Sequence, residues 1–165
     1  MEKLLFKVYK SKKAAVSLKI ISALAVVFSV LTYCVLLYLS FFASVYEGIA
    51  VLLSAALPFL GVSLLRIAIN APRPYELYSF YEIKPKEKCG KSFPSRHAFS
   101  VFVIATLAFF YSIPLGIGIS LFGIALAVAR VFLGIHFIRD VVSGALVGIA
   151  SGFIGIFFLI LPNLT

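Results

Sequence analysis

Five long apolar stretches limit what this chain can fold into more than any other feature of its sequence. Each approaches the roughly 20 residues that a helix needs to cross a bilayer. They lie near residues 16–42, 48–69, 97–113, 115–135 and 141–161. With 62% hydrophobic and 13% charged residues, the chain is too apolar for an ordinary soluble domain. We therefore predict an all-α fold, a polytopic transmembrane helical bundle of about five spans that forms one domain.

The first and the third of these stretches each have an unusual start. Before the first, Lys3, Lys7 and Lys10 recur at helical spacing with apolar residues between them. This pattern predicts an amphipathic helix lying in the headgroup region, and a frayed basic tail is the alternative. The third stretch is short, so its span either begins within Ser92–Ser95 or crosses the bilayer with little tilt.

The second apolar stretch is expected to end near Asn70, because Pro72 and Pro74 lack backbone donors and restrict the residues before them. The connection that follows, residues 70–93, is the one long polar segment. Such a segment is the natural place for a lid or a substrate-recognition element.

The last apolar stretch carries a glycine at every fourth position, at Gly144, Gly148 and Gly152. Glycines on one helix face let two backbones approach closely, which is how helices pack where lipid removes the hydrophobic driving force. We interpret this face as a packing surface in preference to a ligand site.

Three short polar motifs stand at the ends of the apolar stretches and carry the groups needed to break a phosphate ester. Arginines bind phosphoryl oxygens through forked donors, one imidazole can attack phosphorus while another protonates the leaving group, and a carboxylate can orient the attacker. The motifs favour an enzyme over a passive membrane protein. They read Arg66, six residues, Arg73-Pro74; then Pro94-Ser95-Arg96-His97; then Arg130, five residues, His136, three residues, Asp140.

Each of the first two motifs has an ordinary structural alternative. Arg66 and Arg73 lie about two helical turns apart and face the same way if the helix persists that far, but Arg66 alone also fits a snorkelling anchor. Ser95 is a good N-cap, and the free N–H groups of a first helical turn bind anions, which would place His97 beside a phosphate. Taken alone, Ser95 fits an ordinary cap better than a catalytic role.

The third motif predicts an oriented histidine. His136 and Asp140, four residues apart, are expected to share a helix face, so that the carboxylate bonds one ring nitrogen and aims the other. Arg130 falls on another face of a continuous helix, but a break at Gly134 would bring it back. The alternative is an ion pair between Asp140 and Arg139 at the water interface.

Together the motifs resemble those of the type 2 phosphatidic acid phosphatase superfamily, which has a basic residue, six others and Arg-Pro, then Pro-Ser-Gly-His, then Ser-Arg, five others, His, three others and Asp. The resemblance covers residues 66–140. It implies that His136 attacks phosphorus to give a phosphohistidine, that Asp140 orients it, and that His97 protonates the leaving oxygen. It also implies a metal-independent reaction without cofactors. The implied phosphate-binding residues are Arg66, Arg73, Ser95, Arg96 and Arg130.

Three positions depart from the superfamily pattern. Arg66 stands where Lys is usual, which keeps the charge and changes its geometry. Ala129 replaces the Ser before Arg130 and removes a hydroxyl. Arg96 replaces Gly, which adds a cation that can reach the same phosphate or a second one. It would also strain the loop if the position needs a positive φ.

The substrate class follows from the predicted site at the membrane surface, which favours a phosphorylated lipid. The resemblance implies polyprenyl (undecaprenyl-type) diphosphate first, with phosphatidylglycerol phosphate, phosphatidic acid and lipid A as alternatives. A membrane protein that binds or transports such lipids without hydrolysing them is the competing class. Nucleic acid is not an expected partner, because the lysines behind the net charge of +9 flank membrane spans.

The side that the site faces is inferred from the distribution of charge. The basic N-terminal segment and the lysines of residues 70–93 fall on one side of a five-span bundle, opposite Glu47. The positive-inside rule therefore predicts an integral protein of the cell (plasma or inner) membrane with a cytoplasmic-facing site. An interfacial N-terminal helix on the outside would invert this assignment.

Overall fold

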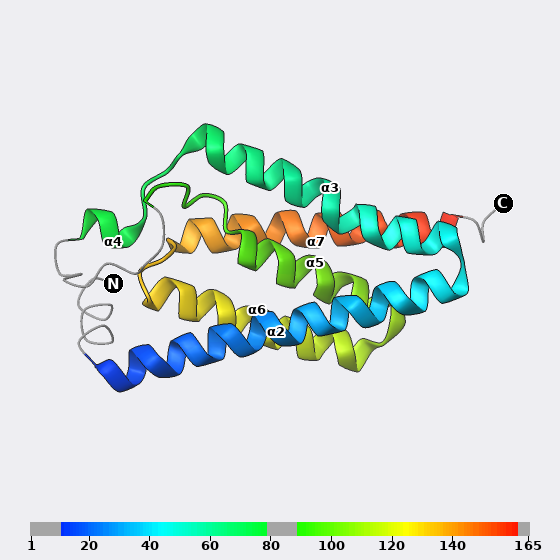
Figure 1. Ribbon diagram of the computed structural model, residues 1–165, viewed down its shortest axis with the longest axis horizontal. Coiled ribbons are helices and arrows are strands. Elements are labelled where there is room, and N and C mark those ends of the chain that lie inside the picture. The colour runs from blue at the N-terminus through cyan, green and yellow to red at the C-terminus, as the bar shows by residue number, and fades with distance from the viewer. Residues whose placement is uncertain (1–10, 79–88, 162–165) are drawn as a thin grey trace.

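The computed structural model describes residues 11–78 and 89–161, and within these ranges the only regular secondary structure is helical (Figure 1). Among the described residues, five long helices run alongside one another, and the short α4 lies at one end of the bundle. The predicted all-α bundle is confirmed. The expected interfacial helix before residue 11 lies outside the described residues. The helices are α2 Lys12–Ala43, α3 Val45–Ile69, α4 Pro74–Leu77, α5 Arg96–Tyr111, α6 Ile113–Phe132 and α7 Ile138–Ile160.

Four of the helices, α2, α3, α6 and α7, are long and apolar enough to cross a membrane. Their outward faces carry exposed leucine, isoleucine, valine and phenylalanine side chains, as expected of surfaces that contact lipid. α5 differs because it has 16 residues and packs against each of the other four long helices. Its length of about 24 Å is less than the hydrocarbon thickness of about 30 Å. A span enclosed by protein does not need to match that thickness.

The bounds of the helices follow from local chemistry. Ser44 and Ser95 cap α3 and α5, each accepting the N–H three residues later. α5 therefore begins at Arg96, directly after the Ser92–Ser95 segment. Where its span enters the membrane stays a prediction. α3 ends as predicted, because Asn70 adopts the left-handed conformation with φ 44°.

The glycine face of α7 packs against α5, as predicted. A methyl group added at Gly144 would overlap the carbonyl oxygen of Ser95, and one at Gly148 would lie 2.5 Å from the carbonyl oxygen of Phe99. At Gly152 it would overlap the side chain of Thr106. This close approach fixes the first turn of α5 against the first turn of α7, where the second and third motifs lie.

Candidate active site

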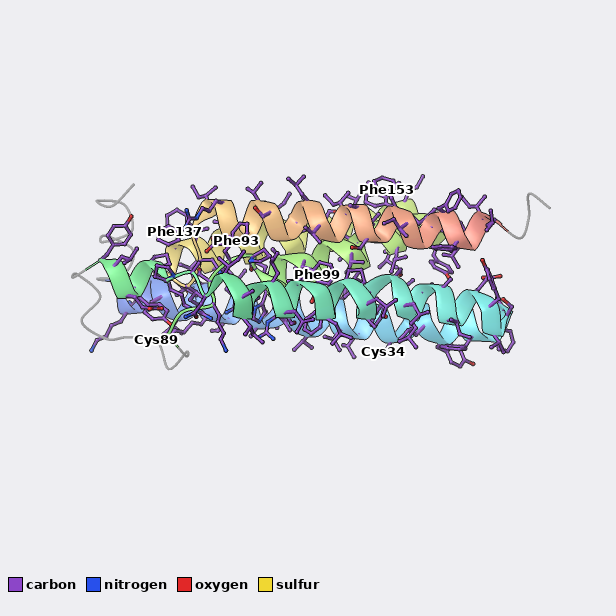
Figure 2. The ribbon with its side chains drawn as sticks, turned by 90° about the horizontal axis from the view of Figure 1, so that it is seen from above. Cys34, Cys89, Phe93, Phe99, Phe137 and Phe153 are labelled. Atoms are coloured by element: carbon purple, nitrogen blue, oxygen red, sulfur yellow. The ribbon has the colours of Figure 1, made fainter. Side chains whose placement is uncertain are left out.

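The three polar motifs come together at one end of the bundle, where α3 and α6 end and α5 and α7 begin (Figure 1). In Figure 2, Phe93, which precedes the second motif, and Phe137, which lies within the third, are both at this end. Backbone hydrogen bonds join the segments: the Ser95 N–H donates to the Asp140 carbonyl at 2.9 Å, and the Tyr75 N–H donates to the Gly134 carbonyl at 3.2 Å. Residues separated by up to 74 positions in the motif core 66–140 therefore share one site.

His136 and Asp140 are paired, but through a different geometry from the one predicted. His136 lies in the turn before α7, not on its face, and is only 2% exposed. Asp140 lies in the first turn of α7, where its Oδ2 accepts the N–H of Phe137 at 3.0 Å. This bond folds the carboxylate back toward the turn. The His136 Nδ1 is consequently 3.6 Å from Asp140 Oδ2.

Ser92, which was not among the predicted site residues, contacts both members of this pair. It is fully buried, and its hydroxyl donates to Asp140 Oδ2 at 2.5 Å. The same oxygen lies 3.3 Å from His136 Nδ1, nearer than the carboxylate. A serine two residues before the Pro-Ser-Arg-His motif carries no distinctive local signal, which is why sequence reasoning missed it.

The alternative pairing of Asp140 with Arg139 is also present. Arg139 Nε lies 3.6 Å from Asp140 Oδ1, on the opposite carboxylate oxygen from His136. The side chain of Arg139 is 66% exposed, so water weakens this ion pair. The two predicted pairings therefore coexist, and the contact with His136 is the buried one.

Arg66 and Arg73 reach the site from separate segments. α3 ends at Ile69, so the helix does not persist to Arg73 and the condition for a common helix face is not met. Arg66 Nη1 donates to the carbonyls of Ser92 and Pro94 at 3.3 and 2.6 Å. Because Arg66 is buried at 5% exposure, its side chain does not snorkel to water.

Arg73 binds the same segment, the residues that precede α5, at another point. Its Nε donates to the Gly90 carbonyl at 3.0 Å, and its side chain is 6% exposed. Glu76, which the sequence analysis did not select, accepts the backbone N–H groups of Arg73 and Gly90 at 3.2 and 2.7 Å. A proline at the first helical position followed by Glu76 is a helix-start signal that could have identified it. The segment preceding α5 is thus fixed at several points.

Ser95 acts as a helix cap, and its role toward phosphate stays a prediction. Its Oγ accepts the Ala98 N–H at 3.4 Å, and the residue is fully buried. A hydroxyl that accepts one bond can still donate another, so capping and anion binding are compatible.

Arg96 is the exposed member of the second motif. It occupies the first position of α5 with ordinary helical geometry, and it is not among the described residues with positive φ. The strain considered for a side chain at this position is therefore absent. Its guanidinium lies over the ring of Phe59, 5.8 Å from the centroid.

His97 and Arg96 line a hollow of about 310 Å³ between α2, α3 and α5. Most of the other side chains that line this hollow are apolar, so the polar Arg96 and His97 lie at one part of an otherwise apolar hollow. His136 does not line this hollow. A larger apolar hollow of about 450 Å³ between α3 and α7 contains none of the motif residues.

Arg130 returns to the site through the predicted break. Gly134 adopts φ 69°, and the N–H groups of Ile135 and His136 donate to the Arg130 carbonyl at 3.1 and 3.3 Å. The turn therefore folds back on the end of α6, and Arg130 adjoins His136 in space. The Gly134 prediction is confirmed.

The electrostatics of the site favour a neutral His136. Burial lowers the pKa of its imidazole below the ordinary value, and the positive charges of Arg73 and Arg66 act in the same direction. The contact with Asp140 opposes this shift without reversing it. A neutral ring keeps a lone pair, as a nucleophile requires. Among the described residues, no three His, Cys, Asp or Glu side chains cluster as metal ligands do.

Comparisons with known proteins agree with this arrangement. The model of the PAP2 superfamily matches residues 47–162. The fold is similar to the crystal structure of LpxE from Aquifex aeolicus, with a TM-score of 0.70, 23% identity, and coverage of 94% of this chain and 93% of that one. It is also similar to a PAP2-type phosphatidylglycerolphosphate phosphatase from Bacillus subtilis, with a TM-score of 0.70, 20% identity, and coverage of 95% and 85%. No curated protein sequence matches significantly.

Proposed function

The chain belongs to the PAP2 superfamily, and from this membership we propose that it is an integral membrane lipid phosphatase that works through a phosphohistidine intermediate. One observation carries the proposal above all. His136 is buried near the first-motif arginines Arg66 and Arg73, its N–H donates to the Arg130 carbonyl, and its Nδ1 faces Asp140 Oδ2 at 3.6 Å. This leaves Nε2 as the nitrogen for attack.

In the proposed first step, His136 Nε2 attacks the terminal phosphorus while the bond from that phosphorus to the leaving oxygen breaks. The leaving group is lipid monophosphate when the substrate is a diphosphate and lipid alcohol when it is a monophosphate. His97 gives its proton to the departing oxygen, and Asp140 stabilises the positive imidazole that forms. In the second step, water attacks the phosphohistidine, the P–N bond breaks, and the water proton passes to His97. Inorganic phosphate leaves, and both histidines return to their starting states.

In this proposal five groups bind the phosphoryl oxygens, and some of them also hydrogen-bond the backbone. Arg66 and Arg73 already brace the segment before α5, but a guanidinium has five N–H donors and can serve the backbone and an anion together. Their positive charges stabilise the extra negative charge of the transition state. The proposed set is Arg66, Arg73, Ser95, Arg96 and Arg130, and no metal or cofactor takes part.

The proposed substrate is polyprenyl (undecaprenyl-type) diphosphate. Arg96 supports this choice, because a diphosphate offers a second anionic group to a cation that stands outside the buried cluster. The hollow of about 310 Å³ beside His97 is lined mostly by apolar side chains, which suits a lipid chain. Phosphatidylglycerol phosphate and phosphatidic acid are the alternative substrates. The two similar structures, at 23% and 20% identity, support the fold and do not rank these lipids.

The experiment that tests the function measures phosphate release by purified protein in detergent with chelator present. The panel holds polyprenyl diphosphate, polyprenyl phosphate, phosphatidylglycerol phosphate and phosphatidic acid, beside a His136→Ala control. Release that needs His136 but no metal supports the proposal. Binding of these lipids without release by the wild-type protein would instead support a phospholipid-binding or transport protein.

We propose further that the site faces the cytoplasm from the cell membrane. The basic start of α2, with Lys12 and Lys13, supports this orientation under the positive-inside rule. Cys89 is exposed at the site end, so a Cys34→Ser variant leaves a single reporter thiol there. A membrane-impermeant maleimide should label Cys89 only after the cells are opened. Labelling in intact cells would reverse the orientation.

A further inference from the structure

The hydroxyl of Ser92 occupies a position that determines where the proton of His136 resides. It is fully buried, 2.5 Å from Asp140 Oδ2 and 3.3 Å from His136 Nδ1. The direct distance from Nδ1 to Oδ2 is 3.6 Å, longer than a normal hydrogen bond. The serine oxygen therefore lies between the carboxylate and the ring as the nearest partner of both.

Hydrogen-bond accounting then fixes the direction of each bond. An ionised carboxylate only accepts, so the single hydroxyl proton of Ser92 points toward Asp140. Toward His136 the hydroxyl can offer only a lone pair. Two lone pairs facing each other at 3.3 Å would repel, so Nδ1 must carry a hydrogen. In a neutral ring, Nε2 is then the unprotonated nitrogen.

We propose that Ser92 is a positioning residue that holds His136 in the Nδ1–H tautomer by relaying the negative charge of Asp140 to the ring. Asp140 then acts on His136 through the hydroxyl as well as across the direct gap. The proposal deepens the proposed function, because it concerns the histidine that would attack phosphorus. Its first test does not need turnover.

The backbone around Ser92 is held in a way that suits this role. Its N–H donates to the Ala71 carbonyl at 2.9 Å, and its carbonyl accepts from Arg66 Nη1 at 3.3 Å. The neighbouring Gly90 is bound by Arg73 and Glu76. A hydroxyl on so constrained a backbone has little freedom to leave the ring, which is what a positioning group requires.

The direct test is ¹⁵N NMR of histidine-labelled protein at a pH where the rings are neutral. The sequence has two histidines, so a His97→Gln variant assigns the signals of His136. Wild-type protein should show a protonated Nδ1 and an unprotonated Nε2. A protonated Nε2 in the wild type would overturn the proposal without any Ser92 variant. The NMR result does not depend on hydrolysis of any substrate. A failure of this proposal can therefore be distinguished from a failure of the proposed function.

Substitution of Ser92 provides the second test. Ser92→Ala should populate both tautomers and lower kcat about 10–100-fold, while KM changes less than about threefold. Ser92→Thr, which keeps the hydroxyl, should recover most of the lost rate. Ser151→Ala is the matched control, because Ser151 is a buried serine whose hydroxyl bonds within its own helix. A single unchanged Nδ1–H form in a folded Ser92→Ala protein would show that Asp140 acts alone.

A double-mutant cycle distinguishes a relay from general loosening of the fold. If Ser92 acts through Asp140, adding Ser92→Ala to Asp140→Asn should cost less than about threefold further in kcat. Multiplicative losses in the double variant would contradict the relay.

Discussion

Replacing Gly144 by alanine should move α5, which carries His97, away from α7 and the turn before it, which carries His136. No reacting group is changed by this substitution. Gly144 lies on α7 against the first turn of α5, and a Cβ there would overlap the carbonyl oxygen of Ser95 while lying 3.3 Å from the Cβ of Ala98. The obstructing atom is backbone, so the conflict is relieved only if the helices move apart. Overpacking of this kind costs about 1–3 kcal/mol. For a chain of this size, that is roughly 2–12 °C in Tm.

The activity should fall further than the stability loss alone implies. Opening the contact moves His97 on α5 away from His136 beside α7, and a misplacement of about 1 Å can cost ~100-fold in rate. We expect kcat to fall about 10–100-fold in protein that remains folded in detergent. Phosphate release and thermal unfolding by intrinsic or dye fluorescence measure the two effects.

Gly118→Ala is the matched control. Gly118 lies in α6 with no atom within 4 Å of an added Cβ, so alanine should gain about 0.5–1 kcal/mol there from helix propensity. If Gly144→Ala matched Gly118→Ala in both stability and activity, the close packing of α5 on α7 would not be what positions the two histidines.

Four further predictions address single groups. Asp140→Asn should lower kcat about 10³–10⁴-fold with KM little changed, as rapid kinetics would show, because the ring loses its carboxylate partner. As pH falls below about 6.5, the stability that His136 contributes should decline, because its lowered pKa keeps the folded ring neutral where the unfolded ring already gains a proton. Activity that needs the neutral ring should persist to lower pH than this, and paired pH–stability and pH–rate profiles test both signs. Arg66→Ala should destabilise the protein by about 1–3 kcal/mol, because it leaves buried carbonyls unpaired. Arg139→Ala, at an exposed side chain, should change the stability by less than about 1 kcal/mol. Thermal melts of the two variants measure this difference. Arg96→Gly should weaken kcat/KM for a lipid diphosphate about 10-fold more than for the monophosphate, since one charge-assisted bond to the second phosphate, the one that is not attacked, is lost.

Hydropathy predicted the helices because lipid leaves a spanning chain few alternatives. The helix ends were also accessible: Pro72 and Pro74 indicated the end of α3 at Asn70, and Gly134 indicated the fold-back after α6. These features depend on residues adjacent in sequence, so local rules were sufficient. The bundle arrangement followed in part from the glycine face of α7, which locates one partner contact.

The internal geometry of the site was less predictable, because it depends on contacts across the bundle. A spacing of four suggested a shared helix face for His136 and Asp140, but the helix begins at Ile138 and the pair meets through a backbone cap instead. Ser92 joins them from 44 residues away in sequence. Nothing local distinguishes it from other serines in this chain, and only the folded arrangement reveals its position.

Isolation of the covalent intermediate would test the central claim most directly. Wild-type protein mixed with ³²P-labelled lipid diphosphate in chelator and quenched within milliseconds should carry label that is stable to alkali and labile to acid, as expected of phosphohistidine, and peptide mapping should place it on His136. His136→Ala should carry none. Full phosphate release by His136→Ala, or turnover by wild-type protein with no label on His136 at any quench time, would contradict the account.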